Sequence, residues 1–374
     1  MALVLLTQRM AEHMNTCSFN EKEYEVVGHI MRRQKPQPVF NFPITMREQA
    51  LRTYRDHDPW WVMTNVELNT FTPSVIPDHG ARGFVFEAEP YPREKFGGKD
   101  MFGVEWEYID VAGGSMVKPG APLFTDANEW KNKVVFPDID SWDWNGSEEL
   151  NRGYCQNGHS NVLTLLNGCW FERLVSFMDF ENAAMALIDE EQQDAVKELI
   201  HETTSLYLRI VDKCVTHFDV DGISIHDDWG SQQAPFFSEE VARRIFLPEM
   251  KRFVNHVHSK GLFCDLHSCG HIEERCGVFV DAGFDSWLPM PMNDTQRLYR
   301  EYGDKILLGV VYEHPFDPET TSEEDQRAAA RDFVEKYTLP GKPAMFSSAY
   351  NPMEMLTKAF REELYRASRY RYGT

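Results

Sequence analysis

The sequence predicts an α/β fold in which a parallel sheet closes into a (β/α)8, or TIM, barrel, and three observations support this prediction. From about residue 160 onward, short apolar segments alternate with helical patterns through six βα repeats. These segments are apolar on both faces, as parallel strands are when helices cover the sheet. No Gly-rich or Ser-rich linker and no internal repeat interrupts the pattern, so 1–374 is expected to be one domain.

Each of the six strands is followed by a helical pattern. The strands are expected at 162–168, 222–228, 262–268, 285–290, 305–311 and 343–349, and the main helices at 180–214, 238–261, 272–282, 321–337 and the segment ending at 370. Capping residues support two of the helices. Ser238 precedes two glutamates and Gly261 closes the same helix, while Thr321 and Ser322 precede a second acidic turn.

Two further strands are needed to close an eightfold barrel. The segment 38–44, PVFNFPI, is the expected first strand, and 102–109, FGVEWEYI, is the expected second. Residues 1–37 are then a helical extension at the N-terminus. Residues 110–158, which are rich in Gly, Pro and Asp, are expected to be an insertion of loops and short helices.

Composition excludes several classes of function. The net charge is −21, from 38 basic and 59 acidic side chains, and no basic stripe is present to bind a phosphate backbone. Nucleic acid is therefore not an expected partner. The apolar run before Thr7 is too short for a signal peptide or a membrane span, so a cytoplasmic protein without a membrane partner is expected. The seven cysteines are scattered and odd in number, which favours free thiols.

Polar side chains follow the predicted strands at the edge where a barrel carries its reacting groups. They are Asn167, His226, Asp227, Asp228, Trp229, His267, Cys269, Glu313, His314 and Tyr350. His267 and Cys269 place an imidazole and a thiol two residues apart, and zinc accepts both ligands. A hydrogen-bonded histidine beside an inert cysteine is the alternative. His271 and Cys276 belong to the following loop and helix, and they can at most complete the site.

The run HDDWGSQ, residues 226–232, is the second cluster. Asp227 and Asp228 can divide acid and base roles, or one can orient a histidine while the other meets the substrate. In the alternative, Asp228 caps a turn and Asp227 is solvated. Trp106 and Trp229 add aromatic surface that suits a flat apolar ligand, although tryptophans are often simply core residues.

Several segments together resemble the uroporphyrinogen decarboxylase superfamily. They are DDWGSQQAPFFSEEVARRIFLPEMKRFVNHVHSKGLFCDLHSCGHIEE, AGFDSWLPMPMND, YGDKILLG and, upstream, NGCWFERLVSFMDFENA. HSCG resembles the cobalamin-dependent methyltransferase branch, whose fold is a TIM barrel and whose zinc is held by a His-x-Cys pair and a distant cysteine. His267 and Cys269 match the pair, but the last strand reads MFSSAYNP and lacks the second cysteine. The arginine-rich segment of the decarboxylases is also missing.

The resemblance implies a zinc-dependent methyltransferase of the O-demethylase type. It would move a methyl group from a small methoxylated, aromatic donor to the Co(I) corrinoid of a partner protein. His267, Cys269 and, as a substitute for the missing cysteine, Glu313 are expected to hold zinc, and a site with fewer thiolates favours a Lewis-acid role. Asp228, with Asp227, is the expected catalytic group. The expected substrate-binding residues are Trp106, Asn167, Trp229, Gln232 and Tyr350.

Two alternatives remain open. The first is a methyltransferase between a methylcorrinoid protein and another donor or acceptor, namely a thiol, an amine or tetrahydrofolate. The second is a metal-free decarboxylase in which Asp227 and Asp228 carry out the acid–base chemistry. A homodimer is a further expectation.

Overall fold

The structure is a computed structural model that describes residues 19–32, 35–111, 113–347 and 350–372. The chain divides into two compact units. The first comprises Met1–Leu68, Gly158–Ser160 and Asp294–Thr374, and the second comprises Asn69–Asn157 and Asn161–Asn293. Among the described helices, none combines the length and the apolar character that crossing a membrane requires.

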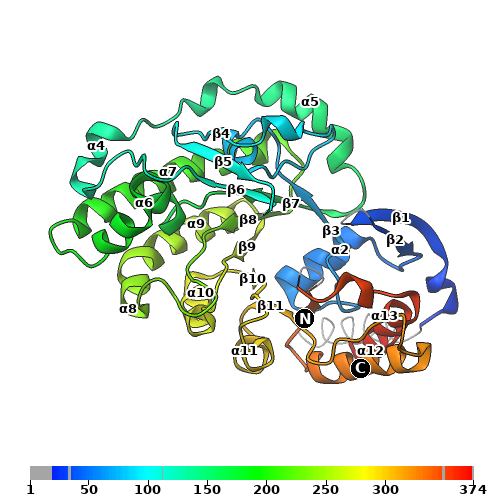
Figure 1. Cartoon of the computed structure of the whole chain (residues 1–374). Helices are drawn as coiled ribbons and strands as arrows, with labels where there is room; N and C mark the ends of the chain where they lie inside the picture. Colours follow the sequence, from blue (N-terminus) through cyan, green and yellow to red (C-terminus); the bar gives the residue numbers. More distant parts are fainter. Residues whose placement is uncertain (1–18, 33–34, 112, 348–349, 373–374) are drawn as a thin grey trace, which may run out of the picture. The chain divides into compact units, whose positions relative to one another are not determined.

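The second unit is built on parallel strands in the order β7-β8-β9-β10. Their bounds are Ser160–Leu165 for β7, Gly222–His226 for β8, Phe263–His267 for β9 and Ser286–Trp287 for β10, with β3 (Leu68–Phe71) next to β7. The helices of this unit are α3 (Pro77–Arg82), α4 (Trp130–Lys133), α5 (Trp144–Cys155), α6 (Phe171–Ala186), α7 (Gln193–His217), α8 (Glu239–Val241), α9 (Leu247–Ser259) and α10 (Cys276–Ala282). Figure 1 shows α6, α7, α9 and α10 around these strands.

The predicted α/β fold class is confirmed, because the described parallel strands form a curled sheet of the barrel type with helices around it. Two predicted helix starts are also confirmed. The Ser238 side chain accepts a hydrogen bond from the Val241 N–H, and the Ser322 side chain accepts one from Asp325 N–H. Gly261, with φ of +75°, follows α9 as expected of a residue that ends a helix.

The predicted second barrel strand, 102–109, is wrong. Its β-forming part is β5 (Glu105–Ile109), which pairs antiparallel with β4 (Gly98–Lys99) and with β6 (Gly114–Val117) in a separate sheet. A strand with one buried face can belong to an antiparallel sheet as well as to a barrel. Here the adjacent segments β4 and β6 provide the pairing partners, so the strand joins an antiparallel sheet. The insertion thus begins before residue 110 and contains strands as well as short helices.

The helical extension predicted for residues 1–37 is wrong where the structure describes it, and residues 1–18 lie outside the described residues. One 3-10 turn, Glu21–Tyr24, precedes an antiparallel hairpin of β1 (Val26–Arg32) and β2 (Lys35–Phe40). The prolines at 36 and 38 lack the N–H that a helix needs. Because β2 pairs with β1, segment 38–44 does not supply the first barrel strand.

The first unit contributes further parallel pairing. Its β11 (Leu307–Val310) pairs parallel with β12 (Ala344–Phe346), and Met63 forms a parallel bridge to Met345 of β12. The chain around Met63 thus takes the place that was predicted for 38–44. The helices of this unit are α2 (Met46–Leu51), α11 (Thr295–Tyr302), α12 (Glu323–Tyr337) and α13 (Lys358–Tyr372).

A buried ionic cluster lies in the second unit. The guanidinium of Arg173 on α6 binds Asp78 and, at 2.7 Å, Asp100, and it also donates to Tyr207 Oη at 2.9 Å. Asp100 further accepts from the indole N–H of Trp106 at 3.1 Å. One cation therefore serves two carboxylates away from water, and the cluster ties α3, α6 and α7 to the antiparallel insertion.

The stability of the protein is expected to depend on pH through Asp78. Burial, together with the second carboxylate Asp100, raises the pKa of Asp78 from 3.8 to about 6 despite Arg173. A carboxyl whose pKa is raised on folding stabilises the protein below pH 3.8, and this contribution is lost as the pH rises through 6. Between pH 5 and pH 7 the free energy of unfolding of the wild type should therefore fall by about 1 kcal/mol relative to that of Asp78→Asn.

Urea denaturation of both proteins at several pH values tests this expectation. Asp194→Asn, which removes a carboxylate whose side chain is 98% exposed in the same unit, is the control for general charge effects. If the wild type instead gained stability over Asp78→Asn as the pH rises, the Asp78 pKa would have to lie below its ordinary value.

Candidate metal centre

Strand register brings two histidines together at the ends of β8 and β9. Ser224 pairs with Asp265, and two residues later His226 pairs with His267. Side chains two positions apart on a strand face the same side of the sheet, so both imidazoles project on the face that carries Ser224 and Asp265. The rings stack with centroids 4.3 Å apart and an interplanar angle of 17°.

Asp228 completes a cluster of potential metal ligands. Its Oδ1 atom is 3.9 Å from His226 Nε2 and 3.8 Å from His267 Nε2. Among the described residues, ligand atoms of His226, Asp228 and His267 all lie within 4.8 Å of one another. Cys269 adds a sulfur 3.2 Å from His267 Nε2. The centre therefore offers two imidazoles, one carboxylate and one thiol.

Two glycines allow the loops that carry Asp228 and Cys269 to meet. Gly270 has φ of +106°, and a Cβ atom added there would lie 2.4 Å from the backbone of Gly230. This close approach of the two loops accompanies a hydrogen bond of 2.7 Å from the Cys269 N–H to Asp228 Oδ1. The glycines in the sequence segments DDWG and HSCG therefore serve the packing of these loops.

A carboxylate outside the cluster holds His226. Glu172, in the first turn of α6, places Oε2 2.5 Å from His226 Nδ1. Its other oxygen lies 3.5 Å from the guanidinium of Arg82, at the end of α3. Arg82 in turn lies over the Trp106 ring, 5.5 Å from its centroid. The histidine is thus anchored on the side away from Asp228.

The surrounding charges and burial shift the pKa values of the two histidines in opposite directions. Burial raises the pKa of Glu172, but the charges of His226 and Arg82 outweigh it and hold this pKa at about 2. Burial lowers the pKa of His226, but Glu172 outweighs it, so the net shift is upward. Burial and the neighbouring His226 lower the pKa of His267 to about 4. Without a metal, His267 is therefore neutral at pH 7, and one of its two ring nitrogens carries a lone pair that a metal could use.

The donor set suits a divalent transition metal, zinc in particular. Two imidazoles and a carboxylate are a common protein ligand set for catalytic zinc, which leaves a further position for substrate. Burial and the Asp228 carboxylate raise the pKa of the Cys269 thiol, which is therefore protonated in the metal-free protein. A cation beside it would favour the thiolate. The residues present thus fit the metal that the sequence resemblance implies.

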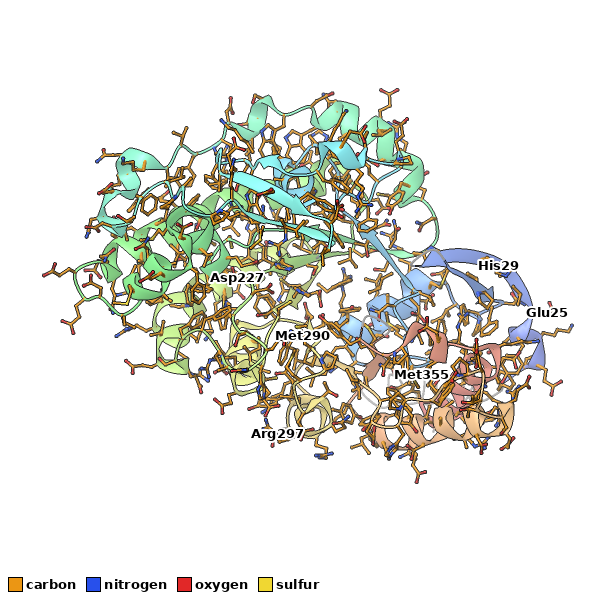
Figure 2. The ribbon with its side chains drawn as sticks, in the orientation of Figure 1. Glu25, His29, Asp227, Met290, Arg297 and Met355 are labelled. Atoms are coloured by element: carbon orange, nitrogen blue, oxygen red, sulfur yellow. The ribbon has the colours of Figure 1, made fainter. Side chains whose placement is uncertain are left out.

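Asp227 lies outside this cluster, although it was predicted to be catalytic with Asp228. Its side chain is fully buried inside the second unit (Figure 2). Its carboxylate accepts from the backbone N–H groups of Phe171 and Glu172, at 3.1 and 3.0 Å, and from the Trp229 indole N–H at 2.6 Å. Burial raises its pKa to about 7. The structure gives Asp227 the role of capping the N-terminus of α6.

The predicted substrate-binding residues of the second unit have different surroundings. Trp229 is buried and packs against Phe237, Phe246 and Phe279, so it is a core residue rather than a pocket wall. Gln232 is exposed in the loop after β8. Trp106 is buried between Asp100 and Arg82.

Asn167, after β7, retains the properties expected of a ligand-binding residue. It is fully buried with φ of +64°, and neither polar atom of its amide bonds to any residue that the structure describes. The next residue, Gly168, comes so close to Asp227 that an added Cβ atom would lie 2.2 Å from Asp227 Oδ1. An unsatisfied buried amide is costly, which favours a substrate or a water as its partner.

The remaining predicted residues belong to the first unit. Both carboxylate oxygens of Glu313 are engaged, one by Lys336 Nζ at 2.9 Å and one by the Tyr337 hydroxyl at 2.8 Å. The carboxylate that the structure places with His267 is Asp228, so Glu313 is not needed as the third ligand. Tyr350 is half-buried in a turn after β12.

The sequence placed His226 among the polar residues at the strand ends but did not predict it as a metal ligand, and it assigned no role to Glu172 or Arg82. His226 could have been predicted as a ligand, because it ends one predicted strand as His267 ends the next, and neighbouring parallel strands bring such end residues side by side. Glu172 and Arg82 left no local signal beyond an acidic residue in a first helical turn and a basic residue in a last one. The neighbouring thiols behave as expected, since Cys276 is buried in α10, and the cysteines that the structure describes form no disulfide.

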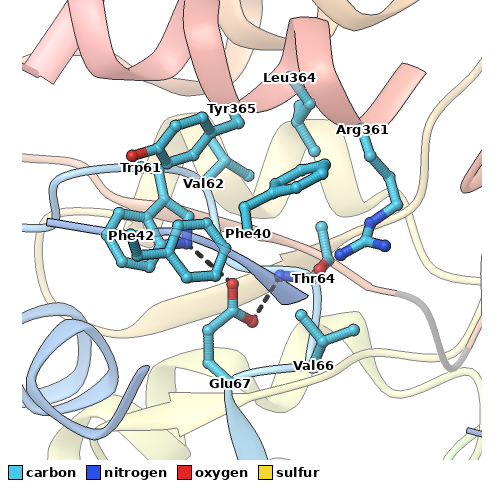
Figure 3. Close-up of a pocket in the computed structure, with 10 residues that line it drawn as sticks. All are labelled: Phe40, Phe42, Trp61, Val62, Thr64, Val66, Glu67, Arg361, Leu364 and Tyr365. Atoms are coloured by element: carbon cyan, nitrogen blue, oxygen red, sulfur yellow. Dashed lines mark hydrogen bonds between the residues drawn. The ribbon is translucent and has the colours of Figure 1, made fainter. Parts of the chain in front are cut away.

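A pocket lies within the first unit and is lined by aromatic rings around Glu67 and Arg361 (Figure 3). Glu67 accepts from the Trp61 indole and from the Thr64 N–H, as the figure shows. Its cavity volume is about 20 Å³, which leaves room for about one water molecule. This pocket is too small for an aromatic substrate.

Comparisons with known proteins find similar structures but no matching sequence family. No family model matches the chain, and no curated protein is similar to it in sequence. Among solved structures, a methyltransferase from Methanosarcina mazei is 14% identical with a TM-score of 0.58, covering 86% of this chain and 98% of that one. A xylose isomerase-like TIM barrel protein from Mycobacterium smegmatis, in complex with magnesium, is 10% identical with a TM-score of 0.34, covering 64% and 82%. The first likeness shows the fold, and the second is too weak for any argument.

Proposed function

We propose that the protein is a zinc-dependent methyltransferase that moves a methyl group from a small methoxylated, aromatic donor to the Co(I) corrinoid of a partner protein. The observation that carries the proposal is the grouping of His226, Asp228 and His267 within 4.8 Å, with the Cys269 sulfur beside them. The fold shared with a methyltransferase and the resemblance of the HSCG segment add support.

The ligand set favours a Lewis-acid role over activation of a thiol acceptor. Zinc supplies, when bound, a Lewis acid that stabilises the negative charge developing on the leaving oxygen of an ether. His267, neutral at pH 7, and Asp228 hold the metal together with His226. Cys269 is a fourth donor, and Asn167 can position a polar group of the donor with its unpartnered amide.

The proposal is tested with metal analysis and a panel of methyl donors. The protein is purified without added metal, and its zinc content is measured. Methoxylated aromatics are then incubated with cob(I)alamin, and methylcobalamin is followed by its visible spectrum. We expect zinc near one ion per chain, and methyl transfer that stops after chelation and returns with zinc.

The outcomes separate the alternatives. Full transfer by protein with verified metal loss would overturn the metal role. Demethylation of methylcobalamin by a thiol, an amine or tetrahydrofolate, without transfer from any ether, would instead favour a methyltransferase that acts between a methylcorrinoid protein and one of these compounds. Release of carbon dioxide from a carboxylated substrate without metal would favour a decarboxylase. That last reading loses support from the buried Asp227, whose carboxylate is occupied by the cap of α6.

A further inference from the structure

Glu172 holds His226 by the nitrogen that faces away from the metal cluster. Its Oε2 atom is 2.5 Å from His226 Nδ1, whereas His226 Nε2 is the nitrogen near Asp228. We infer that Glu172 is a positioning residue, which fixes His226 in the tautomer and orientation that present Nε2 to the metal. This inference rests on the proposed metal site and assigns a role to a residue outside its ligand set.

The tautomer follows from the contact. An ionised carboxylate only accepts hydrogen bonds, so the proton between the two groups belongs on Nδ1. The lone pair of a neutral His226 is then on Nε2, on the side of Asp228 and His267. Carboxylates behind metal-binding histidines commonly orient the ring and raise its basicity, and their removal commonly weakens metal binding about 10–100-fold.

Glu172 is itself fixed, which a positioning residue requires. Its backbone N–H donates to Asp227 at 3.0 Å, and its second oxygen lies 3.5 Å from Arg82. The Arg82 guanidinium is held in turn over the Trp106 ring. Arg82 also offsets the negative charge of Glu172 in this buried position.

The test compares zinc affinity in Glu172→Gln, Glu172→Asp and the wild type by competition with a chromophoric chelator. Glu172→Gln removes the charge with little change in shape, and we expect its zinc dissociation constant to rise about 10–100-fold. Glu172→Asp keeps the charge on a shorter side chain and should recover part of the affinity. The Co(II)-substituted proteins should show altered visible bands in Glu172→Gln, which loss of stability alone would not produce.

Glu148→Gln is the matched control. Glu148 Oε2 is 3.0 Å from His217 Nδ1, a histidine–glutamate contact in the same unit away from the ligand cluster. This variant should bind zinc like the wild type. If it lost as much affinity as Glu172→Gln, the effect would be a general one on the unit, and the inference would be wrong.

The outcomes distinguish this inference from the proposed function. A wild type that binds no zinc would contradict the proposed function. A wild type that binds zinc while Glu172→Gln binds it equally well would contradict the inference alone. If Glu172→Gln does not fold, imidazole ¹H–¹⁵N spectra of the zinc-loaded wild type decide. A proton on His226 Nδ1 supports the inference, and metal bound at Nδ1 overturns it.

Discussion

Replacing His267 by alanine is expected to abolish zinc binding and to reduce methyl transfer at least about 1,000-fold. His267 is the member of the cluster nearest to both Asp228 and Cys269, and burial with His226 keeps it neutral at pH 7. Its loss removes the imidazole that lies next to both the Asp228 carboxylate and the Cys269 sulfur, and only one histidine ligand remains. Loss of about 4 kcal/mol of transition-state stabilisation corresponds to this reduction in rate. Metal content and single-turnover formation of methylcobalamin measure the two effects.

His271→Ala is the control for this experiment. His271 lies four residues away in the same loop and is half-buried, with Nδ1 3.2 Å from the Gln233 carbonyl oxygen. It should keep the zinc and the activity of the wild type. Cys269→Ser then shows whether the thiol is a ligand, because the loss of a ligand sulfur would lower the affinity for zinc. Zinc retained at wild-type affinity in His267→Ala would place the metal elsewhere.

The largest effect on stability is expected from Arg173→Met. Arg173 binds both Asp78 and Asp100, and all three side chains are buried. Methionine fills much of the same space but leaves the two buried carboxylates without their cation. Removing one partner of a buried ion pair costs about 3–5 kcal/mol, a large part of the 5–15 kcal/mol typical of a protein's total stability. Urea denaturation followed by circular dichroism measures the loss.

Arg209→Met gives the comparison at the surface of the same unit. Arg209 pairs with Asp140 at 3.1 Å, but both side chains are more than half exposed. The expected loss is much smaller, because water screens an exposed ion pair. Adding Asp78→Asn to Arg173→Met should restore part of the stability, because one buried carboxylate is removed. Equal losses in Arg173→Met and Arg209→Met would show that the cluster contributes no more than a surface pair.

Local sequence patterns were sufficient for the fold class and for the ends of several elements. Apolar runs between helical patterns predicted the parallel strands, and β8 and β9 lie within the predicted segments 222–228 and 262–268. Ser238 and Ser322 predicted helix starts because a cap satisfies backbone donors only a few residues away. Such features depend on neighbours in the chain, so they can be read from it directly.

The first two barrel strands were misplaced because the identity of a strand's partner is not a local property. The segments 35–40 and 105–109 do form strands, as their residues favour. Each pairs antiparallel with a neighbour close in sequence, β1 in one case and β4 and β6 in the other. A short β-forming segment carries little information on whether its partner is a hairpin neighbour or a distant strand.

The sequence alone determined the α/β class and the position of His267, Cys269 and Asp228 at strand ends. Only the tertiary structure decided which residues join them. Side chains alternate along a strand, so Asp228 lies with His226 while Asp227, one residue earlier, turns to cap α6. The stacked His226 and the supporting Glu172 and Arg82 come from segments far apart in the chain. Their grouping depends on strand register and helix packing, which bring distant residues within hydrogen-bonding distance and leave little trace in any one segment.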